Sequence, residues 1–365
     1  MPPAGAFAAA VARLAPPEGA AGRAAAEHHD RLTKPPGSLG RLEATGVRLA
    51  AIAGRSPPPV PEPAVVAVFA ADHGVVAEGV TPWPQEVTAQ MVANVAAGGA
   101  AVNVLARHGG ASVVVVDVGV ATELGPMDRL WRRKVRPGTG NLAVEAAMTR
   151  DEAGLALDAG AEVADRLVAA GGRCLVTGDL GIGNTTSSAA LVAALTGQPP
   201  GEVTGRGTGV DDATLARKVA VVERGLARAG GWSDPVDLLA TVGGLEIGAL
   251  AGFVVGGAAA RVPVVIDGLI AAAATLVAAA LAPGAVDYCF AGHRSTEPGA
   301  SAALDHLGLE PLVDLGMRLG EGSGACLGLP VLQAAAKVLR EMATFDSAGV
   351  SAKELGGLSP RREVR

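Results

Sequence analysis

Residues 173–190 decide the fold, and they read R-C-L-V-T-G-D-L-G-I-G-N-T-T-S-S-A-A. The apolar start at 174–176 is typical of a buried strand, and three glycines then lead into small polar residues that open an alanine-rich helix. A glycine turn permits close approach of a ligand, and a helix N-terminus offers free N–H groups and a positive dipole end. The stretch predicts a phosphate site at Asn184, Thr185 and Thr186, unless these residues only cap the helix.

Other apolar segments repeat the pattern of strand, glycine turn and long helix. The strand candidates are residues 64–69, 112–118, 173–176, 263–266 and 286–290, and the helices between them include 151–170, 211–229 and 245–260. The strands do not alternate polar with apolar residues, which is typical of parallel strands covered by helices on both faces. We therefore expect a doubly wound α/β fold with a mostly parallel sheet, whose ligands bind beyond the carboxyl ends of the strands.

The domain boundaries follow from proline content and chain length. Five prolines within residues 56–63 predict a stiff linker. We expect an α/β domain at 60–308 that carries the phosphate turn. Residues 1–59 and 309–346, with a last helix at 329–342, should form a smaller all-helical domain with the Glu321 loop at the interface. Residues 347–365 should form a flexible tail.

Composition excludes several classes of protein. A net charge of −6 and a pI near 5.6 argue against nucleic-acid binding, and the basic residues at 129–136 are expected on a solvated loop. Three dispersed cysteines, without metal spacing, predict buried thiols in a reducing compartment, and the N-terminus has no secretory signal. The uncharged segment 268–286 is interrupted by Pro283 and Gly284, so we expect a buried helix and no membrane span. Nucleotide-binding glycine motifs of the ATPase and dinucleotide types are absent from the sequence.

A second glycine-rich loop, M-R-L-G-E-G-S-G at 317–324, carries one acid at its centre. Apolar surroundings would raise the pKa of Glu321 toward that of a general base, although an exposed loop glutamate has the same sequence signature. Arg318 and Lys218 are candidate phosphate partners or surface charges, and Asp179 would accept ribose hydroxyls or cap a helix. The pair Asp72-His73 suggests either a catalytic dyad or a hydrogen-bonded loop pair.

Six motifs resemble one known family in order along residues 28–345. They are K-P-P-G-S-L-G-R-L-E at 34–43, A-D-H-G-V at 71–75 with E-G-V at 78–80, G-D-L-G-I-G-N-T-T at 178–186, V-G-G at 242–244, D-G at 267–268 and M-R-L-G-E-G-S-G-A at 317–325. The chain is therefore similar to the nicotinate-nucleotide–dimethylbenzimidazole phosphoribosyltransferases, which make α-ribazole phosphate for the lower ligand of cobalamin.

The resemblance implies a reaction and a set of site residues. Nicotinate mononucleotide would donate its phosphoribosyl group to 5,6-dimethylbenzimidazole, with Glu321 as general base, inversion at C1′, and neither a metal nor a cofactor. The predicted phosphate and ribose contacts are Asp179, Leu180, Gly181, Ile182, Gly183, Asn184, Thr185, Thr186, Lys218 and Ser295. The predicted base contacts are Trp83, Met91, Met317, Leu319 and Gly320.

Some of these implications leave alternatives open. Some members of the family carry Glu where this chain has the shorter Asp179, and the base wall around Trp83 and Met91 varies, so the acceptor could be another base or a phenol. A non-catalytic nucleotide-binding module is the alternative from another class. The family also implies a cytoplasmic homodimer with small-molecule substrates and without nucleic-acid or membrane partners.

Overall fold

The sheet at the centre of the larger part of the molecule is parallel throughout. In the computed structural model, which describes residues 5–351, its strand order is β3-β2-β1-β4-β5-β6. The strands are β1 Ala64–Ala71, β2 Ala111–Gly119, β3 Leu130–Arg132, β4 Cys174–Leu180, β5 Val264–Ile266 and β6 Cys289–Ala291. From the central β1–β4 pair, the chain adds β2 and β3 on one side and β5 and β6 on the other. The topological switch point of the sheet therefore lies between β1 and β4, where β4 ends and the predicted phosphate turn begins.

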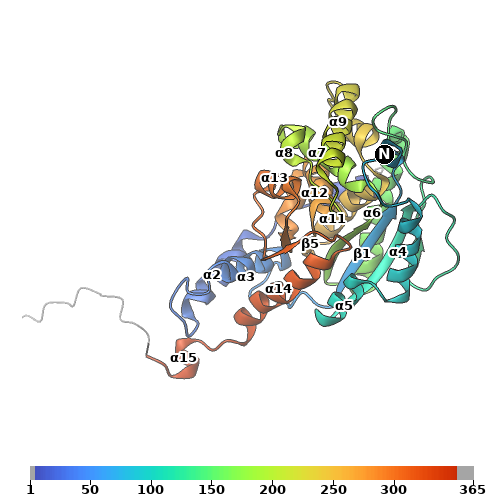
Figure 1. Ribbon diagram of the computed structural model, residues 1–365. Helices are drawn as coiled ribbons and strands as arrows, with labels where there is room; N and C mark the ends of the chain where they lie inside the picture. The colour runs from blue at the N-terminus through green and yellow to red at the C-terminus, as the bar shows by residue number, and fades with distance from the viewer. Residues whose placement is uncertain (1–4, 352–365) are drawn as a thin grey trace, which may run out of the picture. The chain divides into compact units, whose positions relative to one another are not determined.

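Helices cover both faces of this sheet (Figure 1), which confirms the doubly wound α/β prediction. The helices of this larger part up to residue 307 are α1 Ala6–Arg13, η1 Gly74–Glu78, α4 Glu86–Ala97, α5 Ala101–His108, α6 Arg150–Ala169, α7 Asn184–Thr196, α8 Pro200–Val203, α9 Asp212–Ala229, α10 Pro235–Val242, α11 Leu245–Ala259, α12 Leu269–Leu281, η2 Pro283–Tyr288 and α13 Pro298–Leu307.

Small residues let the covering helices approach one another closely. A Cβ added to Gly160 of α6 would lie 1.7 Å from the carbonyl oxygen of Ala249, and one added to Gly252 of α11 would lie 1.9 Å from that of Leu157. Two of the few aromatic rings meet deep in the core, where Phe69 of β1 packs against Phe253 of α11 edge to face at 5.3 Å. An alanine- and glycine-rich sequence is therefore compatible with a close-packed interior.

The apolar segment at 268–286 is a short buried helix, as predicted, since α12 contains 13 residues and the next turn begins at Pro283. Within the described chain, one other run, Glu86–His108, is long and apolar enough for a membrane span by length and composition alone. It consists of two helices, α4 and α5, that are separated by residues 98–100. Neither helix reaches the roughly 20 residues that a bilayer requires.

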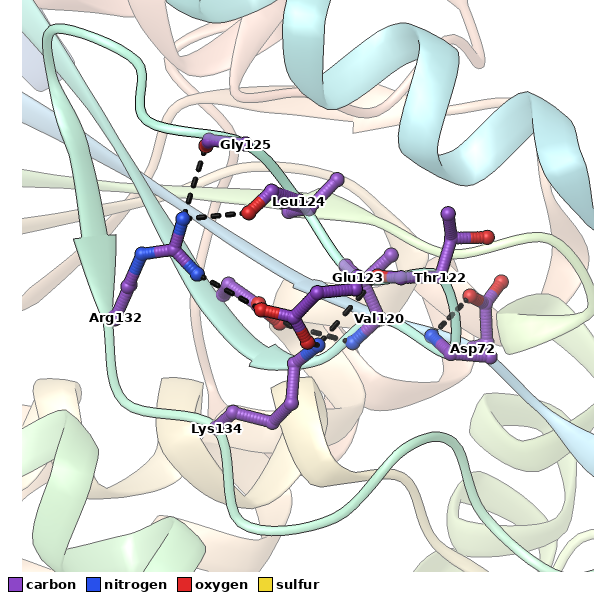
Figure 2. Close-up of polar contacts among 10 residues, drawn as sticks. Asp72, Val120, Thr122, Glu123, Leu124, Gly125, Arg132 and Lys134 are labelled. Carbon is purple, nitrogen blue, oxygen red and sulfur yellow. Dashed lines mark hydrogen bonds and ion pairs between the residues drawn. The ribbon is translucent and has the colours of Figure 1, made fainter.

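The basic segment at 129–136 differs from its prediction as a solvated loop because it contains the edge strand β3, which pairs with β2. Figure 2 shows how its side chains hold the preceding loop. The guanidinium of Arg132 donates to the carbonyl of Gly125 at 2.9 Å, and Lys134 lies 3.4 Å from the buried carboxylate of Asp117. The Asp72 carboxylate accepts the N–H of Ala121 at 2.8 Å, also drawn in Figure 2. The charges therefore fix a loop next to the end of β1.

Three further elements differ from the sequence prediction. Residues 286–288 belong to η2, and β6 starts only at Cys289. A second, two-stranded sheet joins β7 His293–Ser295 to β8 Val313–Met317. The last long helix, α14 Ser323–Glu341, begins six residues before the expected residue 329 and contains Pro330.

The described chain divides into two compact units, one of residues 5–17 and 60–333, the other of 18–59 and 334–351. The second unit contains α2 Gly19–Arg31, α3 Arg41–Ala53 and α15 Phe345–Ala348. This division differs from the expected one, because residues 5–17 belong to the larger unit, and so do residues 309–333. Pairing of β8 with β7 and packing of the Glu321 backbone against Gly178 explain that assignment. Of the predicted tail 347–365, residues 352–365 lie outside the described residues.

Candidate active site

The glycine turn between β4 and α7, the predicted phosphate turn, forms where the sequence predicts a strand, a turn and a helix start. β4 ends at Leu180, the chain passes through Gly183 at φ 96°, and α7 begins at Asn184. Two of the three expected donors are already used, because the N–H of Asn184 donates to Gly181 O at 3.2 Å and that of Thr186 to Gly183 O at 3.0 Å. The N–H of Thr185 has no backbone acceptor among residues 5–351. Of the three expected backbone donors, only the Thr185 N–H therefore remains available for a ligand.

Lys218 of α9 stands behind this turn and is almost fully buried. Its ammonium donates to the hydroxyl of Thr185 at 3.1 Å and to the carbonyl of Gly205 at 2.9 Å. Burial lowers the pKa of Lys218, and the nearby Glu297 carboxylate partly offsets that effect. Because its donors point at Thr185 and Gly205, Lys218 can act on an anion through the Thr185 hydroxyl.

A cavity of about 330 Å³ brings the two glycine-rich segments together. Of the predicted site residues, those that line it are Trp83, Met91, Asp179, Leu180, Gly181, Ile182, Asn184, Thr185, Ser295, Leu319, Gly320 and Glu321. Four others do not line it, namely Gly183, Thr186, Lys218 and Met317. Thr186 is buried inside α7, and Met317 belongs to the backbone pairing of β8 with Ser295.

Glu321 occupies an unusual backbone position at the edge of this cavity. Its φ is 65°, between Gly320 at 85° and Gly322 at 93°, so a non-glycine residue holds a left-handed conformation here. A Cβ on Gly178 at the end of β4 would lie 2.4 Å from the carbonyl oxygen of Glu321, so this glycine permits the loop to approach the strand. This close approach holds the backbone of Glu321 against the end of β4.

The environment of the Glu321 carboxylate favours a proton acceptor. The side chain is 5% exposed, and one oxygen accepts the N–H of Val102 at 3.3 Å. Burial raises the pKa of Glu321, while the Val102 hydrogen bond acts in the opposite direction. A buried carboxylate with a raised pKa is a stronger base than an exposed one.

Asp267 holds the Glu321 loop through two backbone hydrogen bonds. Its carboxylate follows β5 and accepts the N–H of Gly322 at 3.2 Å and that of Ala325 at 2.9 Å, which satisfies donors at the start of α14. His293 lies 3.6 Å away, measured from its Nε2 to Asp267 Oδ1. This cap explains why α14 can start at Ser323, two residues after Glu321.

Asp179 is a buried acid that lines the same cavity. Burial raises its pKa well above the ordinary value, and the charges of Asp267 and Glu246 add to the effect. One carboxyl oxygen accepts the side-chain amide of Asn184 at 3.0 Å, whereas Oδ1 has no hydrogen-bond partner in the described chain. Because Oδ1 can accept a hydrogen bond, Asp179 can bind a ribose hydroxyl.

Comparison with known proteins identifies the family. A sequence model described as phosphoribosyltransferase matches residues 14–350. The chain is 57% identical over 358 residues to the nicotinate-nucleotide–dimethylbenzimidazole phosphoribosyltransferase of Salinispora tropica, covering 94% of this chain and 98% of that relative. The chain belongs to this phosphoribosyltransferase family.

Other members are similarly close. The phosphoribosyltransferase of the same name from Chloroflexus aggregans is 55% identical over 345 residues, covering 94% of this chain and 98% of that relative. A crystal structure of the enzyme from Thermus thermophilus superposes with a TM-score of 0.88 at 50% identity, over 92% of this chain and all of that one. This phosphoribosyltransferase therefore shares both sequence and fold with its relatives.

Several residues that line the cavity were not among the site residues predicted from the sequence. The additional ones are Val87, Gly207, Thr208, Gly268, Leu269, Ile270, His293, Glu297 and Arg318. Val87 could have been found from its helical spacing, four residues before Met91 on one face of α4. Glu297 gave no sequence signal, yet it accepts the N–H of Gly207 at 2.8 Å and leaves its other oxygen without a hydrogen bond in the described chain.

Arg318 lines the cavity. From the sequence, Arg318 and Lys218 were both candidate phosphate partners. Its guanidinium donates to the carbonyl of Gly207, on the loop before α9. Arg318 precedes Glu321 by three residues, so one short segment supplies both a cation and a carboxylate to the cavity.

Proposed function

We propose that this enzyme transfers the phosphoribosyl group of nicotinate mononucleotide to 5,6-dimethylbenzimidazole, giving α-ribazole 5′-phosphate and nicotinate. One observation carries the proposal, since the phosphate turn and the Glu321 carboxylate line the same cavity. Its volume of about 330 Å³ falls within the range of small-molecule sites. The names of the relatives supply the substrates.

The donor is anchored by its phosphate in this proposal. The N–H and hydroxyl of Thr185 bind phosphate oxygens, and Lys218 polarises that hydroxyl through the hydrogen bond between them. Arg318 contributes a second positive charge from the opposite loop. The carboxyl group of Asp179, whose pKa is raised by burial, hydrogen-bonds a ribose hydroxyl.

The acceptor lies against the apolar wall. Trp83, Val87 and Met91 offer flat or flexible apolar surfaces that suit a planar bicyclic ring. Leu319 and Gly320 place the ring edge near Glu321. The substituted benzimidazole therefore presents one ring nitrogen to the carboxylate and the other to the sugar.

The proposed step moves one proton and exchanges one bond at C1′. Glu321 removes the N–H proton of the benzimidazole, and the electron pair of the second ring nitrogen attacks C1′. The bond from C1′ to the pyridinium nitrogen breaks, and its electron pair neutralises that positive nitrogen. Attack from the face opposite the leaving group inverts the sugar from β to α. A positioned general base contributes about 10²–10⁴-fold, and alignment of the two rings adds a proximity effect.

The reaction is tested by incubating the purified protein with nicotinate mononucleotide and a panel of acceptors that includes 5,6-dimethylbenzimidazole, adenine and a phenol. Mass spectrometry should identify ribazole phosphate, with the benzimidazole giving the highest kcat/KM. A higher value for another acceptor would change the assigned acceptor. Binding of the mononucleotide without any product would indicate a nucleotide-binding module.

We further propose that the enzyme works as a cytoplasmic homodimer in the lower-ligand branch of cobalamin biosynthesis. The family resemblance is the support for both statements. Light scattering coupled to gel filtration tests the oligomeric state, because a single species at the monomer mass of 36.0 kDa would contradict the dimer.

A further inference from the structure

A buried charged pair lies beside the phosphate turn but outside the cavity. His73 follows β1, Glu246 lies in the first turn of α11, and neither side chain is exposed. Nε2 of His73 is 2.7 Å from Oε1 of Glu246. Burial acts to lower the pKa of His73, but the Glu246 carboxylate outweighs burial and raises it. The carboxylate therefore favours the charged form of the ring, and each ring nitrogen has a polar side-chain atom within hydrogen-bond distance.

The second ring nitrogen reaches the helix that carries the phosphate turn. Nδ1 of His73 is 3.1 Å from the hydroxyl oxygen of Ser187, which lies in the first turn of α7, two residues beyond Thr185. The pair thus contacts the element that presents the Thr185 N–H, without touching the substrate cavity itself.

Two glycines show how closely the backbone rests on the pair. A Cβ on Gly181, in the turn, would lie 3.4 Å from Nε2 of His73 and 2.5 Å from the carbonyl oxygen of Ala71. A Cβ on Gly244, at the start of α11, would lie 2.6 Å from Cε1 of His73 and 2.8 Å from Oε2 of Glu246. Packing on both sides leaves the imidazole little freedom to rotate.

The preceding residue supports the other end of the same turn. Asp72 is hydrogen-bonded by the hydroxyl of Thr88, and that hydroxyl oxygen accepts the N–H of Ile182 at 3.1 Å. Asp72 is therefore linked to Ile182 of the turn through the Thr88 hydroxyl of α4. His73 contacts Ser187 of α7 through its imidazole ring. This arrangement gives the motif a use other than the catalytic dyad that its sequence suggested.

We propose that His73 and Glu246 are positioning residues that hold Ser187, and with it the Thr185 donors, in the geometry that binds the donor phosphate. A buried ion pair by itself adds little to stability compared with an apolar replacement, so its presence under the turn is better explained by orientation. The inference rests on the proposed function, because it assigns the pair to the phosphoribosyl anchor.

The test removes the hydroxyl that the pair holds. Ser187→Ala shortens a side chain in a helix and should raise the Kd and KM of nicotinate mononucleotide about three- to tenfold, as expected for one buried hydrogen bond, with kcat nearly unchanged. His73→Asn places an amide near the position of Nδ1 and should retain more affinity than His73→Gln, whose amide reaches toward Glu246.

Thr275→Ala is the matched control, since its buried hydroxyl donates only to the carbonyl of Ala271 within α12 at 2.8 Å. This variant should lose stability without a change in mononucleotide Kd. Wild-type affinity in Ser187→Ala, or better retention in His73→Gln than in His73→Asn, would overturn the positioning role. A wild-type protein that binds no mononucleotide would refute the proposed function itself, and calorimetric titration with the mononucleotide alone distinguishes the two failures.

Discussion

Replacing Glu321 by glutamine removes the proposed base while leaving its surroundings nearly unchanged. The glutamine oxygen can still accept the N–H of Val102, and the loop remains held by Asp267 through Gly322 and Ala325. The substitution adds no volume, and the left-handed backbone at residue 321 stays as it is. We therefore expect Glu321→Gln to fold normally and to bind nicotinate mononucleotide with an affinity close to wild type.

The chemical step should be affected strongly. An amide does not accept the benzimidazole proton, so the full contribution of general-base catalysis is lost. We expect single-turnover rates to fall at least about hundredfold, which corresponds to about 2.7 kcal/mol in the activation barrier. The rate is measured by rapid quench with saturating mononucleotide and base, followed by chromatographic separation of the product.

Glu123→Gln serves as the control, because Glu123 lies on the surface and pairs with Arg132 and Lys134 in the loop of Figure 2. Its rate should equal that of wild type. An unchanged rate in Glu321→Gln would refute the reasoning and exclude this carboxylate from proton transfer. A loss of mononucleotide affinity equal to the loss of rate would instead assign Glu321 to substrate binding.

The pH dependence, the phosphate site and the anchor of the catalytic loop can each be tested separately. Only the ionised carboxylate accepts a proton, so the rate should fall as the pH drops through the pKa of Glu321, which burial raises above the ordinary 4.5; a pH–rate profile without that acid limb contradicts the assignment. Lys218→Ala and Arg318→Ala should each raise the KM of the mononucleotide about tenfold, as for a lost charge-assisted hydrogen bond, and an unchanged KM would place that cation outside the phosphate site. Asp267→Asn weakens the anchor of the catalytic loop and should lower kcat about tenfold while the Kd of the mononucleotide stays constant; calorimetry showing a weaker Kd as well would oppose a role confined to Glu321.

The sequence predicted the elements whose signals are local. The strands at 64–71, 111–119 and 174–180 are long apolar runs, and each ends close to a polar or glycine-containing loop, so their parallel arrangement could be inferred. The family resemblance implied that Asn184 and Glu321, about 140 residues apart, belong to one site, and both line the same cavity.

The missed elements depend on contacts between distant segments. β3 and β7 contain only three residues each, too few for a periodic signal, and they exist because a neighbouring strand is present to pair with them. The early start of α14 depends on Asp267 as a cap from another strand, which outweighs the glycines and Pro330 in that stretch.

Details of the anion site were also beyond sequence reasoning. The N–H groups of Asn184 and Thr186 are taken by carbonyls within the turn itself, a consequence of its particular backbone path. Likewise, the burial of Lys218 behind Thr185 and the exposure of Arg318 to the cavity depend on how the loop at 205–210 folds over α9. Only the three-dimensional structure shows that Arg318 lines the cavity, whereas Lys218 lies behind Thr185.

The central claim is that a phosphate held at Thr185 directs C1′ toward an acceptor held at Glu321. Its most direct test is a crystal structure of Glu321→Gln with nicotinate mononucleotide and 5,6-dimethylbenzimidazole bound. We predict the phosphate on the Thr185 N–H, one benzimidazole nitrogen about 3 Å from the side chain at position 321, and the other facing C1′ opposite the nicotinate. A phosphate bound away from Thr185, or a benzimidazole on the same face of the sugar as nicotinate, would contradict the account.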